Sequence, residues 1–151
     1  MKTFLAPLAL CMALHAGSAA AQQDSTPPMS PQAVAEMTPL ADAFFRSLQS
    51  GDSSKAFREL FAGTLMEGKQ DELQTLITQT NVYLDAYGTL TSWSMIRSDC
   101  LSPTYCRAIF QVENKNGPMF YTLTVHRRAG VWMTSSIFLT DRGQAFFDLP
   151  N

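Results

Sequence analysis

Two cysteines in the second half of the chain have a spacing that suits a disulfide. Cys100 and Cys106 are separated by five residues, which include Pro103, and they lie between two strand-like runs. A redox pair of the thioredoxin type has only two intervening residues at the start of a helix. The spacing therefore favours a structural disulfide within one chain, which we expect to stabilise the fold by about 2–3 kcal/mol.

His126 is the other side chain in this half that could perform chemistry. It alternates in phase with Phe120 along a strand-like run, so it either lines a pocket as a general base or lies on a solvated face. A lone histidine does not assemble a zinc site without acidic or thiolate ligands, and the two cysteines are committed to each other. We therefore expect no metal site and no cofactor.

Several other classes of site have no support in the sequence. There is no serine in a nucleophile-elbow setting, no glycine-rich phosphate loop and no acidic calcium loop. The formal net charge of −2 is mildly acidic. Such a balance gives no electrostatic basis for binding nucleic acid or an anionic membrane surface, so we expect no nucleic-acid partner.

Aromatic and polar-aromatic residues are concentrated on the strand-like runs and on the end of the helix before them. If that helix and the sheet diverge at one end, the rings would line an apolar cavity with hydroxyl and indole groups, which is typical of small-molecule sites. The alternative is an ordinary hydrophobic core. The candidate pocket residues are Tyr83, Tyr87, Trp93, Phe110, Phe120, His126 and Trp132.

The N-terminus has the pattern of a secretory signal peptide. Lys2 precedes an apolar run over residues 4–14, and small residues follow as far as Ala21, where we expect cleavage. The run is shorter than the ~20 residues of a membrane-spanning helix, so we expect no membrane span after cleavage. The protein is thus predicted to be exported, either periplasmic or secreted, and an oxidising compartment agrees with a disulfide.

Three helices are expected in the first half of the mature chain. Residues 22–37 contain three prolines and are predicted to be a flexible leader. The first helix is predicted to start at Thr38-Pro39, a cap followed by proline, and a short second helix to follow the cap at Asp52. The third is the longest, over residues 69–87, with Gly88 at its end. Residues 38–151 then form a single domain.

The periodicity changes from helical to alternating at Leu90. Strands are predicted over residues 90–98, 105–113, 119–128 and 131–139, with Leu90 on the same face as Ser92. The short connections require an antiparallel meander. The fold class is therefore α+β, with N-terminal helices packed on a curved four-stranded antiparallel sheet. Residues 140–151 are predicted to form a helical turn whose Phe146 and Phe147 cover an edge or a pocket mouth.

The order of helices, the long helix that ends in Tyr87-Gly88 and the strand opening Gly130-Val131-Trp132 resemble the nuclear transport factor 2-like, cystatin-like cone superfamily. The resemblance covers roughly residues 39–139. It is greatest to small exported bacterial domains of unknown function, which share the Gly-x-Trp start of a late strand and a Gly-Asp after the first helix, here Gly51-Asp52.

Enzymes of that superfamily similar to ketosteroid isomerase use an aspartate base and a tyrosine with a protonated acid. The predicted strand interiors here carry no aspartate, because Asp99 is placed beside the cysteine loop, so the resemblance supplies no catalytic residue. We expect a binding or accessory module for a small apolar ligand or a periplasmic protein. The alternatives are a structural subunit that forms a homodimer through its sheet, and an isomerase- or hydrolase-like enzyme in which His126, Tyr83 and Tyr87 meet in one cavity.

Overall fold

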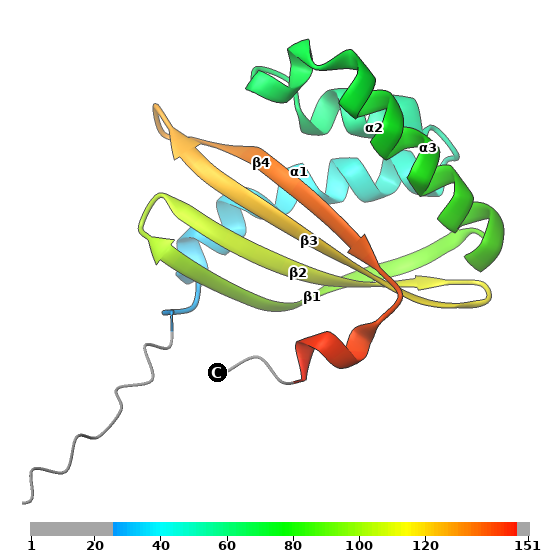
Figure 1. The fold of residues 1–151 in the computed structure, drawn as a ribbon. Coiled ribbons are helices and arrows are strands. Elements are labelled where there is room, and N and C mark those ends of the chain that lie inside the picture. Colours follow the sequence, from blue (N-terminus) through cyan, green and yellow to red (C-terminus); the bar gives the residue numbers. More distant parts are fainter. Residues whose placement is uncertain (1–25, 148–151) are drawn as a thin grey trace, which may run out of the picture.

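Three helices precede a four-stranded sheet in the computed structural model, which describes residues 26–147 (Figure 1). The helical elements are α1 (Pro31–Gln49), α2 (Ser53–Leu60), the 3-10 turn η1 (Leu65–Gly68), α3 (Gln70–Tyr87) and a last 3-10 turn, η2 (Gly143–Phe146). The strands are β1 (Leu90–Ser102), β2 (Tyr105–Asn114), β3 (Gly117–Arg128) and β4 (Val131–Thr140). The predicted signal peptide lies outside the described residues.

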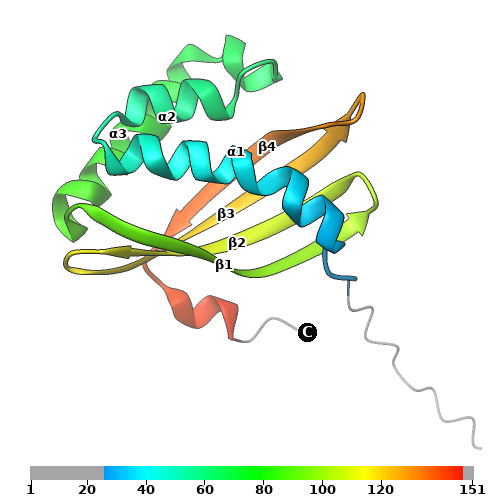
Figure 2. The ribbon, with the colours of Figure 1, turned by 180° about the vertical axis from the view of Figure 1, so that it is seen from behind.

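The strands form one open antiparallel sheet in the order β1-β2-β3-β4. The helices α1, α2 and α3 lie on one face of this sheet, and η2 lies on the other (Figures 1 and 2). Hairpin connections of two residues join all four strands, which leaves no room for crossover helices. The predicted α+β class, with helices packed on one face of an antiparallel sheet, is confirmed.

The first helix begins at Pro31, so the predicted start at Thr38-Pro39 is wrong. The Ser30 side chain accepts a hydrogen bond from the Ala33 amide at 3.2 Å, and Pro31 occupies the first turn, where its missing N–H costs nothing. Pro39 is tolerated inside α1. The extra turns are held by tertiary packing, because Met37 is fully buried. Residues 31–37 are therefore helical rather than part of a flexible leader.

The predicted start of α2 and both predicted ends of α3 agree with the structure within one residue. Asp52 caps α2 by accepting a hydrogen bond from the Lys55 amide at 2.8 Å. The third helix ends at Gly88, whose φ of +79° lies in the left-handed region that favours glycine. Local capping chemistry therefore decides these ends, as the sequence indicates.

Register shifts, three between β1 and β2 and one between β3 and β4, affect which side chains of the edge strands face the helices. A register shift between Leu90 and Ser92 turns Leu90 inward, so its predicted placement on the same face as exposed Ser92 is wrong. The shift between β3 and β4, opposite Thr124 and Val125, leaves Ser135 of β4 without a partner on β3. The predicted inward row on β2 (Cys106, Ala108, Phe110 and Val112) is buried, and β3 shows a regular alternation. Ile109 of β2 is buried on the opposite face.

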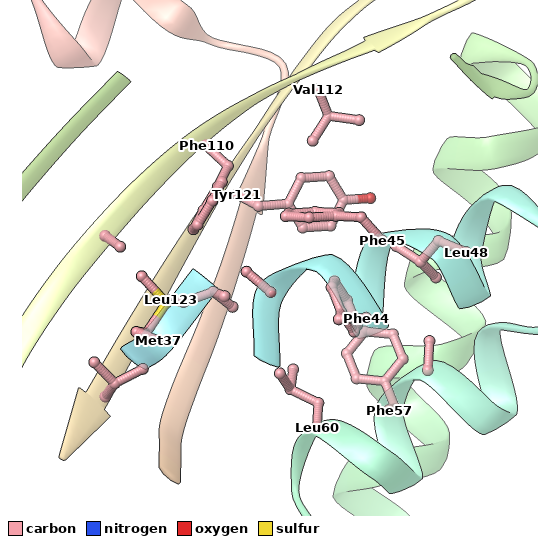
Figure 3. Packing of buried hydrophobic residues seen from close by; sticks show 14 of the residues in the cluster. Met37, Phe44, Phe45, Leu48, Phe57, Leu60, Phe110, Val112, Tyr121 and Leu123 are labelled. Atoms are coloured by element: carbon pink, nitrogen blue, oxygen red, sulfur yellow. The ribbon is translucent and has the colours of Figure 1, made fainter. Parts of the chain in front are cut away.

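The core lies between α1, α2 and the middle of the sheet. The ring of Phe45 lies 5.2 Å from that of Phe110 and 5.4 Å from that of Tyr121, measured between centroids, and Phe44 contacts Phe57 of α2 at 5.2 Å (Figure 3). All five side chains are at most 3 % exposed. The edge-to-face geometry of the Phe44–Phe57 and Phe45–Tyr121 pairs adds to the free energy gained from burial.

The turn η2 packs on the sheet face opposite the helices. Phe146 lies 5.4 Å from Phe120 between ring centroids, and Gly143 approaches the same ring so closely that a Cβ atom there would lie 2.6 Å from it. The predicted return of Phe146 is thus confirmed as a contact with the sheet. Phe147 is 79 % exposed, so the expectation that it also covers the protein is wrong.

Candidate functional site: the groove between α3 and β4

The two cysteines are bonded to each other, which confirms the predicted disulfide. Cys100 and Cys106 are direct partners across the β1–β2 hairpin, with their Cα atoms 4.0 Å apart. The Cys100 amide also donates a hydrogen bond of 2.8 Å to the Pro27 carbonyl. The bridge therefore has a structural position at one edge of the sheet.

Asp99 lies inside strand β1 rather than in a loop, so the expectation of strands without aspartate is wrong. Its carboxylate is paired with Arg107, which donates from Nη2 at 2.6 Å and from Nε at 3.1 Å, and Arg97 approaches it at 3.7 Å. These groups lie on the face opposite the helices. A carboxylate held by two guanidinium groups is a poor general base, so Asp99 has a structural role.

The seven candidate pocket residues do not come together in one place. Five pack in or beside the core, on the helical side: Tyr83, Tyr87, Trp93, Phe110 and Trp132. Phe120 and His126 project from β3 to the opposite face, because the residues between them are the buried ones. Tyr87 lies at the end of α3 and donates a hydrogen bond of 2.6 Å to Asp141.

The two tryptophans of this set fix α1 to the sheet. The Trp93 indole donates to the Asp42 carboxylate at 2.8 Å, and the Trp132 indole donates to the Glu36 carboxylate at 3.1 Å. The Glu36 carboxylate also pairs with the Arg127 guanidinium at 3.0 Å. Both indole groups are thus satisfied within the protein and are not available to a ligand.

His126 and the tyrosines of α3 lie on different faces of the sheet. His126 Nδ1 is 2.8 Å from the Ser135 hydroxyl, and no carboxylate contacts the ring in the described part of the chain. Tyr83 and Tyr87 lie on the helical side, with ring centroids 6.4 Å apart. The enzyme alternative depended on these three residues meeting in one cavity, and they do not meet.

The structure instead forms a groove between α3 and the edge strand β4, which run side by side in Figure 1. It consists of two depressions of about 420 and about 360 Å³, which adjoin because Leu76 and Ile137 line both. The first is also lined by Thr78, Gln79, Val82, Tyr83, Phe138 and Leu139. The second is also lined by Phe61, Met66, Glu72, Thr75, Ser135 and Ser136.

Apolar side chains and hydroxyl groups dominate this groove. Glu72 is its one charged lining residue, and that carboxylate lies 3.7 Å from the Lys69 amino group on an exposed turn. Val82 and Phe138 on the rim are 63 % and 61 % exposed, so they extend the apolar surface beside the groove. The lining favours neutral, apolar molecules that carry hydrogen-bonding groups.

Two buried hydroxyl groups, one on α3 and one on β4, lack hydrogen-bond partners among the described residues. They are the Oγ1 atoms of Thr80 and Thr134. The side chain of Tyr121 is also buried. Burial raises the pKa of Tyr121 above its usual 10.0, and nearby Tyr83 raises it further. Figure 3 shows the Tyr121 oxygen directed away from Phe110, toward the helices. Unpartnered buried polar groups are rare in folded proteins.

Sequence reasoning identified only Tyr83 among the groove residues. The signal in the sequence is Val82, an apolar residue on the side of α3 away from Leu73 and Ile77. An apolar residue outside the buried stripe of an amphipathic helix indicates a wider apolar surface.

The fold and groove define an α+β protein in which a helical layer covers one face of an open antiparallel sheet. No protein-family model matches the chain, and no curated protein matches it in sequence. Within residues 26–147, no helix is both long and apolar enough to cross a membrane.

Proposed function

We propose that this protein is an exported binding or accessory module that holds a neutral, apolar small molecule in the groove between α3 and β4. The observation that carries the proposal is the groove itself, an apolar depression beside a core that is otherwise closely packed. Its two parts have volumes in the range of small-molecule sites. The signal peptide pattern and the disulfide support export.

The resemblance to the cone superfamily is part of the same proposal. Helices followed by a strand meander, with the helices on one sheet face, support it. In this protein the centre of the helical side is filled by Phe45 and Tyr121. A ligand would therefore lie at the margin of the helical layer, where α3 leaves β4 partly uncovered.

Among the described residues, neither depression of the groove is lined by arginine, lysine or histidine, which narrows the ligand class. The cations nearest to it lie at its margin: Lys69 pairs with Glu72, and His126 and Arg128 line a third depression that shares Met66 and Ser135 with the second. A phosphate or carboxylate group inside either depression would therefore lack a cationic partner. The hydroxyl groups of Thr75, Thr78 and Ser136 offer hydrogen bonds to alcohol, ketone or amide groups. Sterol-like or aromatic molecules with few polar atoms fit this chemistry better than anionic lipids.

Thermal unfolding with a panel of neutral sterols, aromatic alcohols and ketones tests the proposal. A ligand at 100 times its Kd stabilises the folded state by about 2.7 kcal/mol, which raises Tm by on the order of 10 °C. The neutral dye Nile red provides a direct fluorescence readout of the apolar site. Leu76→Lys should abolish both signals, because Leu76 lines both depressions.

Leu101→Lys is the matched control, since Leu101 is 76 % exposed on the far edge of the sheet and should leave ligand binding unchanged. The proposal fails if no member of the panel raises Tm and Nile red does not bind. It also fails if both lysine variants lose the signal to the same extent, because the dye would then report general surface hydrophobicity.

A further inference from the structure

The two edges of the sheet are protected very differently. On β1, the Cys100 amide pairs with Pro27, the Gln49 side chain contacts the carbonyls of Leu90 and Thr91, and Asp99 places a charge in the strand. These are the usual means by which an edge strand is kept from pairing with another chain.

The outer edge of β4 has none of these three features within the described chain, and its one irregularity is the bulge at Ser135. All ten residues from Val131 to Thr140 are uncharged, and none is proline or glycine. No backbone hydrogen bond from the described chain reaches this edge. An uncovered strand of this composition is a template for one more strand.

The sequence after the bulge is symmetrical in residue class. Residues 136–140 read Ser-Ile-Phe-Leu-Thr. The two outermost residues carry hydroxyl groups, the next residue inward on each side is aliphatic, and Phe138 is in the centre. In an antiparallel pair of identical strands related by a two-fold axis, each contact occurs twice. If residue i of one copy lies opposite residue j of the other, then residue j of the first copy lies opposite residue i of the second. A strand with this symmetry can pair with itself without a mismatch.

We propose that β4 pairs antiparallel with β4 of a second copy of this chain, with Phe138 on the two-fold axis. Ser136 then lies opposite Thr140 and Ile137 opposite Leu139, so that hydroxyl faces hydroxyl and apolar faces apolar. The absence of charge removes the like-charge repulsion that limits most self-pairing strands. The result is a continuous eight-stranded sheet.

This pairing also places a second copy beside the groove. Ile137 and Leu139 line the groove on the helical side, and the same residues of the second copy would extend its floor beneath α3. Phe138 is 61 % exposed in the single chain, and its ring would meet its own copy across the axis on the other face. The dimer does not depend on whether the groove takes a ligand.

Cysteine cross-linking tests the register directly. Residues paired across antiparallel strands have Cα atoms about 4.5–5.5 Å apart, within the reach of a disulfide. Phe138→Cys should therefore give a disulfide-linked dimer under oxidising conditions. Val131→Cys is the matched control on the same strand, with a similar exposure of 63 %. Its two copies would be about 45 Å apart, so it should remain unlinked.

Light scattering on exported protein supplies the second measurement. The unmodified chain should be a dimer at micromolar concentrations, and Phe138→Lys should weaken the dimer by on the order of 100-fold, because two like charges would face each other on the axis. Val131→Lys should leave it intact. A monomeric unmodified chain would overturn the proposal, as would a dimer in which Phe138→Cys fails to cross-link. Equal weakening by both lysine variants would also overturn it.

Discussion

Helices α1 and α3 cover the same face of the sheet, but only α1 is packed tightly against it. The side chain of Phe45 on α1 contacts rings from three strands, and the indoles of Trp93 and Trp132 hold carboxylates at two points along the helix. Helix α3 packs mainly against α2 and leaves the groove beside β4. The comparison separates the region that stabilises the fold from the region that remains open to a ligand or partner.

The largest effect is expected from truncation on the α1 side. Phe45→Ala removes a fully buried ring from the aromatic cluster, and we expect it to lower the free energy of unfolding by about 3–5 kcal/mol. Leu76→Ala on α3 should cost less than about 2 kcal/mol, because that side chain is only partly buried. Urea denaturation of both variants measures the contrast. Equal costs would show that α3 contributes as much stability as α1.

The disulfide sharpens the comparison between the two sheet edges. Replacing Cys100 and Cys106 by alanine should cost about 2–3 kcal/mol through the lost restriction of the unfolded chain. If β1 is the stable edge, removal of the disulfide should increase amide hydrogen exchange mainly on β1 and leave exchange on β4 unchanged. A larger increase in exchange on β4 than on β1 would contradict this assignment of the edges.

The polar contacts of α1 should contribute less to the free energy of unfolding than its aromatic rings do. Glu36→Ala removes the acceptor of the Trp132 indole and the partner of Arg127, and we expect a loss of about 1–2 kcal/mol. The control is Glu59→Ala, whose carboxylate meets Lys55 only at 4.0 Å on an exposed helix face and should contribute less than about 0.5 kcal/mol. Thermal unfolding of the two variants distinguishes a part-buried network from a surface ion pair.

The smallest change at neutral pH is expected for Tyr121→Phe. Because the buried ring stays in place, removal of the Tyr121 hydroxyl should alter stability by less than about 1 kcal/mol. The raised pKa of Tyr121 means that the folded state holds this proton more tightly than the unfolded chain. The contribution of this proton to the free energy of unfolding is therefore complete below pH 10. It is lost as the pH rises through the folded-state pKa of Tyr121.

Unfolding curves recorded at alkaline pH measure the contribution of Tyr121 to stability. Stability of the unmodified protein should fall above about pH 10, and Tyr121→Phe should make the decline shallower. Tyr87→Phe serves as the comparison at the end of α3, where a hydrogen bond to Asp141 raises the pKa of a partly buried tyrosine. If Tyr87→Phe flattens the curve more than Tyr121→Phe, the buried hydroxyl is not the source of the pH dependence.

Much of the fold could be predicted from the sequence because it depends on local features. The Asp52 cap sets the start of α2, and Gly88 sets the end of α3. The alternation of apolar residues on β2 and β3 indicates which of their faces is buried. The prediction for α1 was wrong because two proline-containing starts, at Ser30 and Thr38, carry the same local signal. The burial of Met37 favours the earlier one, and burial is a tertiary effect.

The candidate site was harder to predict because it depends on where the faces of distant elements meet. A single bulge reverses the face of every later residue on a strand. The aromatic residues of β1, β3 and α3 lie in different environments for this reason and because they belong to different layers. Nothing in the local pattern of Ile137 or Leu76 shows that α3 stands partly clear of β4.

The sequence by itself determined the α+β class, the antiparallel meander and the cysteine pair, because periodicity, turn residues and spacing act over a few neighbouring residues. Tertiary structure alone decided that Trp93 and Trp132 would fix α1 while Tyr83 would line a groove. The physical reason is that burial of each ring depends on the angle and distance between packed layers, which no short stretch of the chain specifies.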